Sequence, residues 1–507
     1  MAKKAKKKAA KKQEKKAKKE RKQKKEKKKE LKKLEKKRAK QEKKAKKAKK
    51  HEKAKKQKTA RGKKTQAKGP AKKAAVRKKA VSAKRSPAKP ARKAAPKARG
   101  KKPAAGPAVQ PVSVEQAPAL AAPPPPPAEA KTRRVLAALN HQEADRVPVG
   151  EFFWTTFVRR CQKEYGPSFS PYHHWDLDLI VVNPNMDPHI TGIQVLERDD
   201  DHIVVRTGFG AVIESRSDCP MPAFREFQTQ TYEQMDALAF DDPADPRRYH
   251  QAIADQINGV GDAINLELPS FVDRVKGVAD DFCVFGSVCE PHEMIWRIMG
   301  TDNVLLKLAE EPARMAKFIE RLGEFLEGIV HAQVKAAGGL LKGLYVWGDV
   351  AYDHGMFFSP AYWREVYMPQ VKRICDAAHS YGLKTIYHGC GDARAIYDGL
   401  IEAGVDCYNP LEAKAGLDVV ELKRQFGRRW AFNGNIDVRV LATNDREKVR
   451  REVLRKLNAA RGGGYILQSD HSIPDNVAPS TYDYVVQLAR EYGKYPLELG
   501  EFEEAEA

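Results

Sequence analysis

A histidine and a cysteine stand two positions apart in residues 387–392, Tyr-His-Gly-Cys-Gly-Asp. The apolar run before them predicts a buried strand, and side chains alternate along a strand, so Ile386, His388 and Cys390 should point the same way. An imidazole and a thiol would then lie side by side where the strand passes into a glycine-flanked loop. Because zinc prefers His and Cys, the pair is a candidate metal site, although a buried thiol beside a hydrogen-bonded histidine is the alternative.

Polar residues also follow the neighbouring β-rich runs, whose middles are Ile, Val, Leu and Phe. Five such ends are Trp347-Gly348-Asp349, His388–Asp392, Tyr408–Glu412, Asn433–Asp437 and Ser469-Asp470-His471. Each end alone has a structural explanation, such as Asp392 serving as a helix N-cap. Together on one rim they predict an active site rather than a binding scaffold.

Eight short β-rich runs alternate with amphipathic runs and predict the elements that position these residues. The predicted strands are 147–150, 179–182, 281–286, 343–347, 384–387, 405–408, 430–432 and 465–468. The predicted helices are 312–335, 360–381, 393–403, 417–426, 446–460 and 480–492, and an early hairpin is predicted at 202–206 and 211–214. This alternation predicts an α/β fold and favours a (β/α)8 TIM barrel. A doubly wound sheet is the rival, but no Gly-x-Gly-x-x-Gly turn opens any of these helices.

Charge divides the chain in two. The formal net charge is +28, yet residues 1–102 hold 52 Lys and Arg against 7 Glu, whereas residues 103–507 carry a net charge of −17. The first segment has too few apolar residues to offset chain entropy, so we predict a long disordered basic tail at 1–102. Residues 103–131 include five consecutive prolines and predict a Pro/Ala-rich linker.

The basic tail predicts non-specific binding of nucleic acid or another polyanion through counterion release, because no interleaved aromatic residues could stack on bases. The alternative is a solubilising extension with no selected partner. No apolar segment resembling a signal peptide follows Met1, and no run approaches the roughly 18 apolar residues of a transmembrane segment. Seven scattered cysteines in a large body are typical of a reducing, cytoplasmic protein.

Residues 132–496 resemble the uroporphyrinogen decarboxylase superfamily. The matching motifs are Arg134–His141, Asp145–Val149, Glu290–Gly300, Gly404-Val405-Asp406, Gly434–Asp437 and Gly462–Leu467. The resemblance implies a (β/α)8 barrel over 132–500, with a deep cleft at the carboxyl ends of the strands and a short acidic tail at 501–507.

Two branches of this superfamily compete. Decarboxylases carry an Arg-Gln-Ala-Gly-Arg motif whose arginines hold substrate carboxylates, whereas this chain has residues 149–154 there, with Arg159 and Arg160 further on. A tetrapyrrole with eight carboxylates also suits a body of charge −17 poorly. Corrinoid-dependent methyltransferases, such as the methylcobamide:coenzyme M enzymes, instead hold zinc with His-x-Cys and a later Cys. His388 and Cys390 match the first two ligands, and His471 stands at the later position, where decarboxylases also place a His.

The first interpretation is therefore a zinc-dependent methyltransferase that moves a methyl group between a corrinoid on a partner protein and a small-molecule thiol or related acceptor. Its metal ligands would be His388, Cys390 and His471.

Three further residues are catalytic candidates on this interpretation. They are Asp349, Glu412 and Asn435, of which the first two could orient a ligand or position the substrate. The runner-up is uroporphyrinogen decarboxylation in porphyrin biosynthesis, which needs no cofactor. A third possibility, from another class, is an inactive barrel that carries a polyanion-binding tail.

Overall fold

The computed structural model describes residues 127–190, 192–217, 219–253 and 268–504. The predicted tail at 1–102, most of the predicted linker and residues 505–507 of the acidic tail lie outside the described residues. Helix α2 (Pro127–Leu139) begins inside the range 103–131 that the sequence assigns to the linker. Proline fits the first turn of a helix, and Lys131 in this helix is already buried, which explains why a helix occurs where the composition indicates linker.

Seven parallel strands form a curved sheet in the order β1-β6-β7-β10-β11-β12-β13. Their bounds are β1 (Leu179–Val181), β6 (Cys283–Cys289), β7 (Gly343–Trp347), β10 (Lys384–His388), β11 (Cys407–Asn409), β12 (Ala431–Asn433) and β13 (Tyr465–Ile466). Seven of the eight predicted strands are therefore confirmed.

The eighth predicted strand, residues 147–150, joins the two ends of this sheet through a short bridge. Val149 forms a parallel bridge with Leu467, and the Gly150 N–H donates to the Leu467 carbonyl at 3.0 Å. The Val149 carbonyl accepts from the N–H of Asp178, just before β1, at 2.8 Å. The segment thus lies between β13 and β1, and the predicted TIM barrel is confirmed.

Helix α2 plugs one end of the barrel. Its Val135, Ala138 and Leu139 pack against inward-facing strand residues, namely Leu179, Cys283, Phe285, Tyr345, Ile386, Cys407, Ala431 and Ile466. The Gly464 N–H, just before β13, donates to the Ala138 carbonyl at 2.9 Å, so α2 covers the amino ends of the strands. Any internal cavity must therefore open at the carboxyl ends, as it does in other barrels of this kind.

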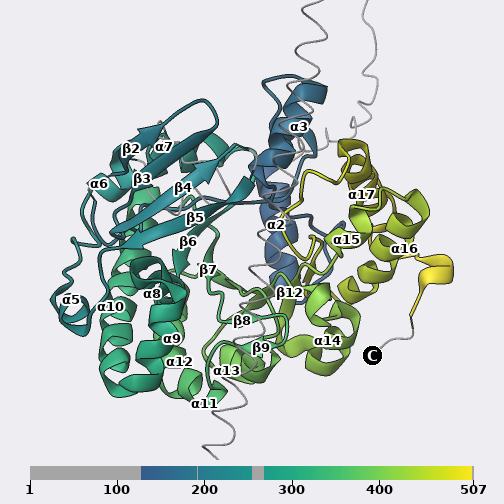
Figure 1. Ribbon diagram of the computed structural model, residues 1–507. Coiled ribbons are helices and arrows are strands. Elements are labelled where there is room, and N and C mark those ends of the chain that lie inside the picture. The colour runs from purple at the N-terminus through teal and green to yellow at the C-terminus, as the bar shows by residue number, and fades with distance from the viewer. Residues whose placement is uncertain (1–126, 191, 218, 254–267, 505–507) are drawn as a thin grey trace, which may run out of the picture. The chain divides into compact units, whose positions relative to one another are not determined.

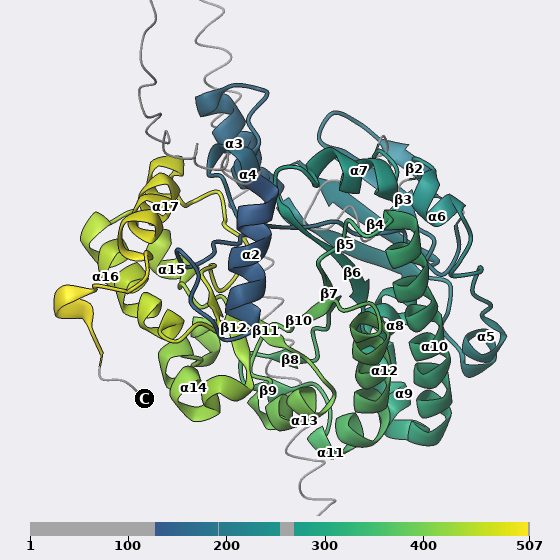
Figure 2. The same cartoon turned by 180° about the vertical axis from the view of Figure 1, so that it is seen from behind.

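Two groups of helices cover the outer face of the strands (Figures 1 and 2). On one side lie α8 (Pro291–Met299), α9 (Thr301–Glu310), α10 (Pro312–Ala337) and α12 (Met368–His379). On the other lie α14 (Val419–Phe426), α15 (Val438–Leu441), α16 (Arg446–Leu457) and α17 (Pro479–Tyr492). The remaining helices are α3 (Thr155–Tyr165), α4 (Pro171–His174), α5 (Tyr232–Ala237), α6 (Arg247–His250), α7 (Phe271–Val278), α11 (Pro360–Tyr362) and α13 (Tyr397–Glu402). Within the described residues, none of the helices combines the length and apolar character needed to cross a bilayer.

The helix predicted at 360–381 is interrupted. A π-helical turn at Trp363–Tyr367 separates α11 from α12. Pro369 lacks an N–H and its ring crowds the preceding turn, which accounts for the change in hydrogen-bond spacing at this point.

An antiparallel sheet is inserted between β1 and β6 (Figure 1). Its strands, in spatial order, are β2 (Gln194–Arg198), β3 (His202–Arg206), β4 (Ala211–Arg216) and β5 (Cys219–Phe227). The predicted hairpin is confirmed as β3 and β4. The sequence did not reveal β2, which is exposed at every position, or β5, whose two prolines argue against a strand but are tolerated at the edge of a sheet.

Candidate metal centre and its cavity

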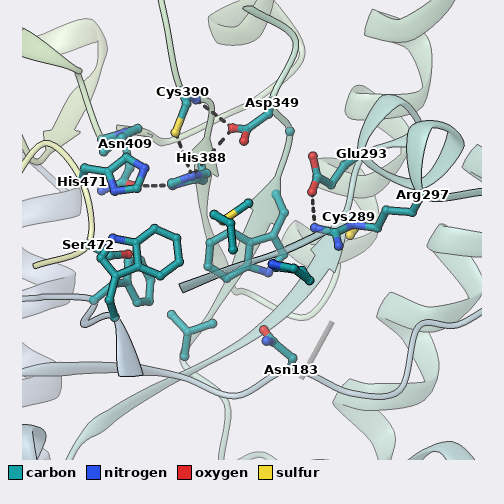
Figure 3. Close-up of a pocket in the computed structure, with 18 of the residues that line it drawn as sticks. Asn183, Cys289, Glu293, Arg297, Asp349, His388, Cys390, Asn409, His471 and Ser472 are labelled. Carbon is teal, nitrogen blue, oxygen red and sulfur yellow. Dashed lines mark hydrogen bonds and ion pairs between the residues drawn. The ribbon is translucent and has the colours of Figure 1, made fainter. Parts of the chain in front are cut away.

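A cavity of about 370 Å³ opens at the carboxyl ends of β6, β7 and β10 (Figure 3). Its aromatic lining consists of Phe152, Phe153, Trp154, Tyr172, Phe224, Trp296 and Trp347. Its polar and titratable lining consists of Asn183, Ser215, Cys289, Glu293, Arg297, Asp349, His388, Cys390, Asn409, Gln468, His471 and Ser472. Four predicted site residues, Asp349, His388, Cys390 and His471, are thus brought together around one space.

The register of the barrel places His388 on the cavity floor. His388 on β10 is level with Trp347 on β7 and with Asn409 on β11. Ile386, two positions earlier, lies inside the barrel, so the predicted alternation along β10 is confirmed. His388 Nε2 lies 3.5 Å from Cys390 Sγ, as the same-face argument requires.

Asp349 lies beside this pair, in the loop that follows β7. Its Oδ1 accepts the Cys390 N–H at 2.8 Å and lies 3.8 Å from His388 Nε2. Burial raises the pKa of Asp349, and burial next to Asp349 and Glu412 raises the pKa of the Cys390 thiol well above its usual value. A bare Cys390 thiol is therefore protonated near neutral pH, and a bound cation would favour its thiolate.

His471 approaches the pair from the loop after β13. Its ring stacks on Trp154, with ring centroids 5.4 Å apart, and burial lowers the pKa of His471. A neutral imidazole is the form that binds a metal. Ligand atoms of Cys390, Glu412 and His471 lie within 4.8 Å of one another, as do those of Asp349, His388 and Cys390. The predicted set of His388, Cys390 and His471 is therefore divided between two groups that share the Cys390 sulfur.

The donor set of this centre fits zinc. Zinc–ligand lengths of about 2.3 Å for sulfur and about 2.0 Å for nitrogen give a tetrahedral edge of about 3.5 Å between the two ligand atoms. The observed separation of 3.5 Å between Cys390 Sγ and His388 Nε2 matches that edge. His388 Nδ1, on the far side of the ring, lies 2.6 Å from Asn409 Oδ1, so Nε2 faces Cys390 while the other nitrogen is engaged.

Glu412 lies beside the candidate metal centre but is not among the described residues that line the cavity. Its side chain is buried, and its Oε2 accepts the Gly391 N–H at 2.8 Å. Its Oε1 lies 3.2 Å from Lys414 Nζ. Asp349 and Glu412 thus hold the loop around Cys390 from two sides, through successive backbone N–H groups.

Asn435 joins neighbouring loops in the structure, and its role as a catalytic residue stays a prediction. Its Oδ1 accepts from the Val419 N–H at 2.8 Å and from Lys456 Nζ at 2.6 Å. Its Nδ2 donates to the carbonyls of Leu411 and Leu417. The side chain is fully buried, and its hydrogen bonds join the loops that follow β11 and β12.

Asp470 fixes the loops of the rim, a role that the sequence did not reveal. Its Oδ2 accepts the Ala413 N–H at 2.9 Å, and its Oδ1 accepts the Val438 N–H at 2.9 Å. Asp470 therefore ties the loop after β13 to the loops after β11 and β12. The sequence placed Asp470 on the rim, but its partners lie 57 and 32 residues away.

An ion pair on α8 lines the opposite side of the cavity, and the sequence did not reveal it. Arg297 donates to Glu293 Oε1 at 2.6 Å, and Trp296 Nε1 donates to Glu293 Oε2 at 3.0 Å. Glu293 and Arg297 stand four positions apart on a helix, a spacing that could have indicated the pair. Arg159 and Arg160, the arginines nearest to the missing decarboxylase motif, instead donate to backbone carbonyls.

The sequence of the chain is similar to that of a known protein family. The sequence model of the uroporphyrinogen decarboxylase (URO-D) family matches residues 203–492. A uroporphyrinogen decarboxylase from Streptomyces avermitilis is 27% identical over 179 residues, which are 35% of this chain and 47% of that protein. The match therefore spans about half the length of that relative. A uroporphyrinogen decarboxylase from Shewanella piezotolerans is 23% identical over 383 residues, or 73% of this chain and 99% of that protein.

Structural comparison supports the same fold. A methyltransferase from Methanosarcina mazei superposes with a TM-score of 0.52 at 15% sequence identity, over 71% of this chain and 98% of that chain. At this identity the likeness concerns the barrel fold alone.

Proposed function

Because the chain belongs to the uroporphyrinogen decarboxylase family, we propose that it is a zinc-dependent methyltransferase of that family. Its reaction would move a methyl group between a corrinoid, carried by a partner protein, and a thiol or related small acceptor. The observation that carries this proposal is the 3.5 Å approach of Cys390 Sγ to His388 Nε2 at the floor of the cavity.

His388, Cys390 and His471 would hold the zinc, and Asp349 would lie next to it. When bound, zinc would supply Lewis-acid chemistry by lowering the pKa of a substrate thiol toward neutrality. Asp349, whose pKa burial raises, is suited to accept the proton that such a thiol gives up. The aromatic side chains around the cavity would exclude water and pack against the substrate.

Uroporphyrinogen decarboxylation is the second candidate, favoured by the similarity of the chain to two uroporphyrinogen decarboxylases. A substrate with eight carboxylates needs several cationic partners. Among the described residues that line the cavity, Arg297 is the one guanidinium, and it is already paired with Glu293. This lining supports the methyltransferase proposal over the decarboxylase.

Metal analysis tests the proposal. The purified full-length chain should bind about one zinc ion, and Cys390→Ser should lose most of that zinc while remaining folded, as a single cooperative unfolding transition would show. Cys289→Ser is the matched control, because Cys289 lines the same cavity outside both groups of candidate ligands and should leave zinc binding unchanged. Full zinc retention in Cys390→Ser would remove this residue from the metal centre.

An activity comparison separates the two candidates. The zinc-loaded protein is offered a methylated corrinoid with a small thiol in one assay and uroporphyrinogen under anaerobic conditions in another. We expect methyl transfer in the first. Steady release of carbon dioxide with formation of coproporphyrinogen in the second would reverse the ranking.

A further inference from the structure

A row of hydrogen-bonded side chains crosses four strand ends below the cavity. Asn433 on β12 donates from Nδ2 to the Ile466 carbonyl on β13 at 3.3 Å. Asn409 on β11 donates from Nδ2 to the Asn433 carbonyl at 2.9 Å and to its Oδ1 at 2.8 Å. Asn409 Oδ1 then lies 2.6 Å from His388 Nδ1 on β10. Asn409 and Asn433 are fully buried.

Hydrogen-bond chemistry fixes the direction of this row. A backbone carbonyl can only accept, so the Asn409 atom that faces the Asn433 carbonyl must be its NH₂ group. The Asn409 oxygen is thereby turned toward His388, and because that oxygen also only accepts, His388 Nδ1 must carry a proton. In a neutral imidazole the other nitrogen, Nε2, is then unprotonated and can act as a ligand. Each side chain thus donates to the next, from His388 through Asn409 and Asn433 to the Ile466 carbonyl.

We propose that Asn409 is a positioning residue that holds His388 in the tautomer protonated at Nδ1, so that Nε2 is the metal-binding nitrogen. Asn433 in turn holds the Asn409 amide in the required orientation. The inference rests on the proposed zinc site for its consequence, but the tautomer itself exists without metal. Free rotation of the Asn409 amide would present an NH₂ group to His388 and favour the opposite tautomer.

The first test measures the tautomer in the metal-free protein. The full chain is labelled with ¹⁵N-histidine, and long-range ¹H–¹⁵N spectra are recorded at a pH where His388 is neutral, with His388→Gln to assign its signals. We expect Nδ1 to be protonated and Nε2 bare. A protonated Nε2 in the wild-type protein would overturn the proposal, whether or not the chain binds zinc or transfers methyl groups.

The second test separates the bond to His388 from the bonds to Asn433. Asn409→Leu removes both, whereas Asn409→Asp keeps an acceptor for His388 and loses the donors to Asn433. Competition with a chelator should show zinc affinity falling about 10–100-fold in Asn409→Leu, the usual cost of removing a group that orients a ligand, and by less than about threefold in Asn409→Asp. Equal losses in the two variants would mean that the bonds to Asn433 matter and the acceptor does not, which contradicts the proposal.

Melting temperatures of the two variants serve as a folding check. Both lose the Asn433 bonds, so both should melt below the wild type, and only Asn409→Leu should lose zinc. If neither variant folds, the tautomer measured in the wild-type protein still decides the question.

Discussion

One wall of the cavity stands on the ends of parallel barrel strands, and the opposite wall stands on α8 and the inserted sheet. The strand-end wall carries His388 and Asn409, which bond neighbours on adjacent strands, and Cys390, whose sulfur lies 3.5 Å from His388 Nε2. The inserted wall presents Ile213 from β4 and Phe224 from β5, together with the Glu293–Arg297 pair of α8.

This difference suggests that the two walls serve different purposes. Ligand atoms need placement within a few tenths of an ångström, and rigid strand ends provide it. The inserted wall offers apolar area, including Met221 on its edge strand, so we predict that this wall selects among substrates. Variants on the two walls should therefore affect different measurements.

The largest expected effect concerns Glu151, a buried carboxyl behind the strand-end wall. Ser469 Oγ lies 2.6 Å from Glu151 Oε1, and burial raises the pKa of Glu151 to about 8 from 4.5. A raised folded-state pKa means that the stabilisation is complete below the unfolded value and is lost as pH rises through about 8. At about 1.4 kcal/mol for each unit, this loss amounts to about 5 kcal/mol.

Urea denaturation of wild type and Glu151→Gln between pH 5 and pH 9 measures that loss. The wild type should lose stability with rising pH relative to the variant, whose amide does not titrate. Glu290, whose pKa burial also raises to about 8, is present in both proteins, so their difference isolates Glu151. Parallel pH profiles would show that Glu151 is ionised in the folded protein throughout.

The ion pair of the inserted wall should show the opposite pH dependence of stability. Arg297 lowers the pKa of buried Glu293, so its stabilising contribution is present above the unfolded pKa and is lost as pH falls. Arg297→Met leaves a buried carboxylate unpaired and should lower the free energy of unfolding by about 3–5 kcal/mol. The double variant Glu293→Gln/Arg297→Met should recover most of this loss.

Zinc binding provides the control for that experiment. Glu293 and Arg297 belong to neither group of candidate ligands, so the affinity for zinc should stay within about twofold of wild type. A large loss of zinc in Arg297→Met would show that the two walls are coupled.

The third prediction distinguishes the two ligand groups that share Cys390. If His471 is the third ligand, His471→Ala should weaken zinc binding about 100-fold, or about 2.7 kcal/mol, and Asp349→Asn only about 10-fold, as expected for a residue beside the metal. Chelator competition measures both. A larger loss in Asp349→Asn would assign the zinc to Asp349, His388 and Cys390.

Much of this arrangement follows from local sequence patterns. The alternation of Ile386, His388 and Cys390 along one strand predicted their common face, and polar residues at strand ends predicted the rim. The roles of Asn409 and Asn435 could not be predicted, because both are amides at or just after the end of a strand and differ in their partners. Asn409 meets His388 across a strand pair, whereas Asn435 meets Val419 and Lys456, and such partners depend on tertiary structure.

The smallest effect on stability is expected from removal of residues 1–126, which precede α2. Removal of residues 1–131 should lower the melting temperature more. Lys131 is 4% exposed, bonds Asp176 at 2.6 Å and lies over the Phe282 ring. The shorter deletion keeps this contact and should leave the melting temperature and the zinc affinity of the protein unchanged. The longer deletion removes the first turn of α2 and should lower the melting temperature by a few degrees, the shift expected for about 1 kcal/mol.

Melting temperatures measured at low and high salt show whether the basic tail contributes to stability. Residues 1–102 carry +45 and the remainder −17, and opposite charges attract within a Debye length of about 8 Å at physiological salt. If the tail contacts the acidic body, the 1–126 deletion will lower the melting temperature at low salt, and high salt will reduce the difference from wild type. If the tail acts separately, as we propose, the melting temperatures will agree at all salt concentrations. The deletion will then abolish binding to DNA or RNA, which in the full chain weakens steeply as salt rises because each neutralised phosphate releases a counterion.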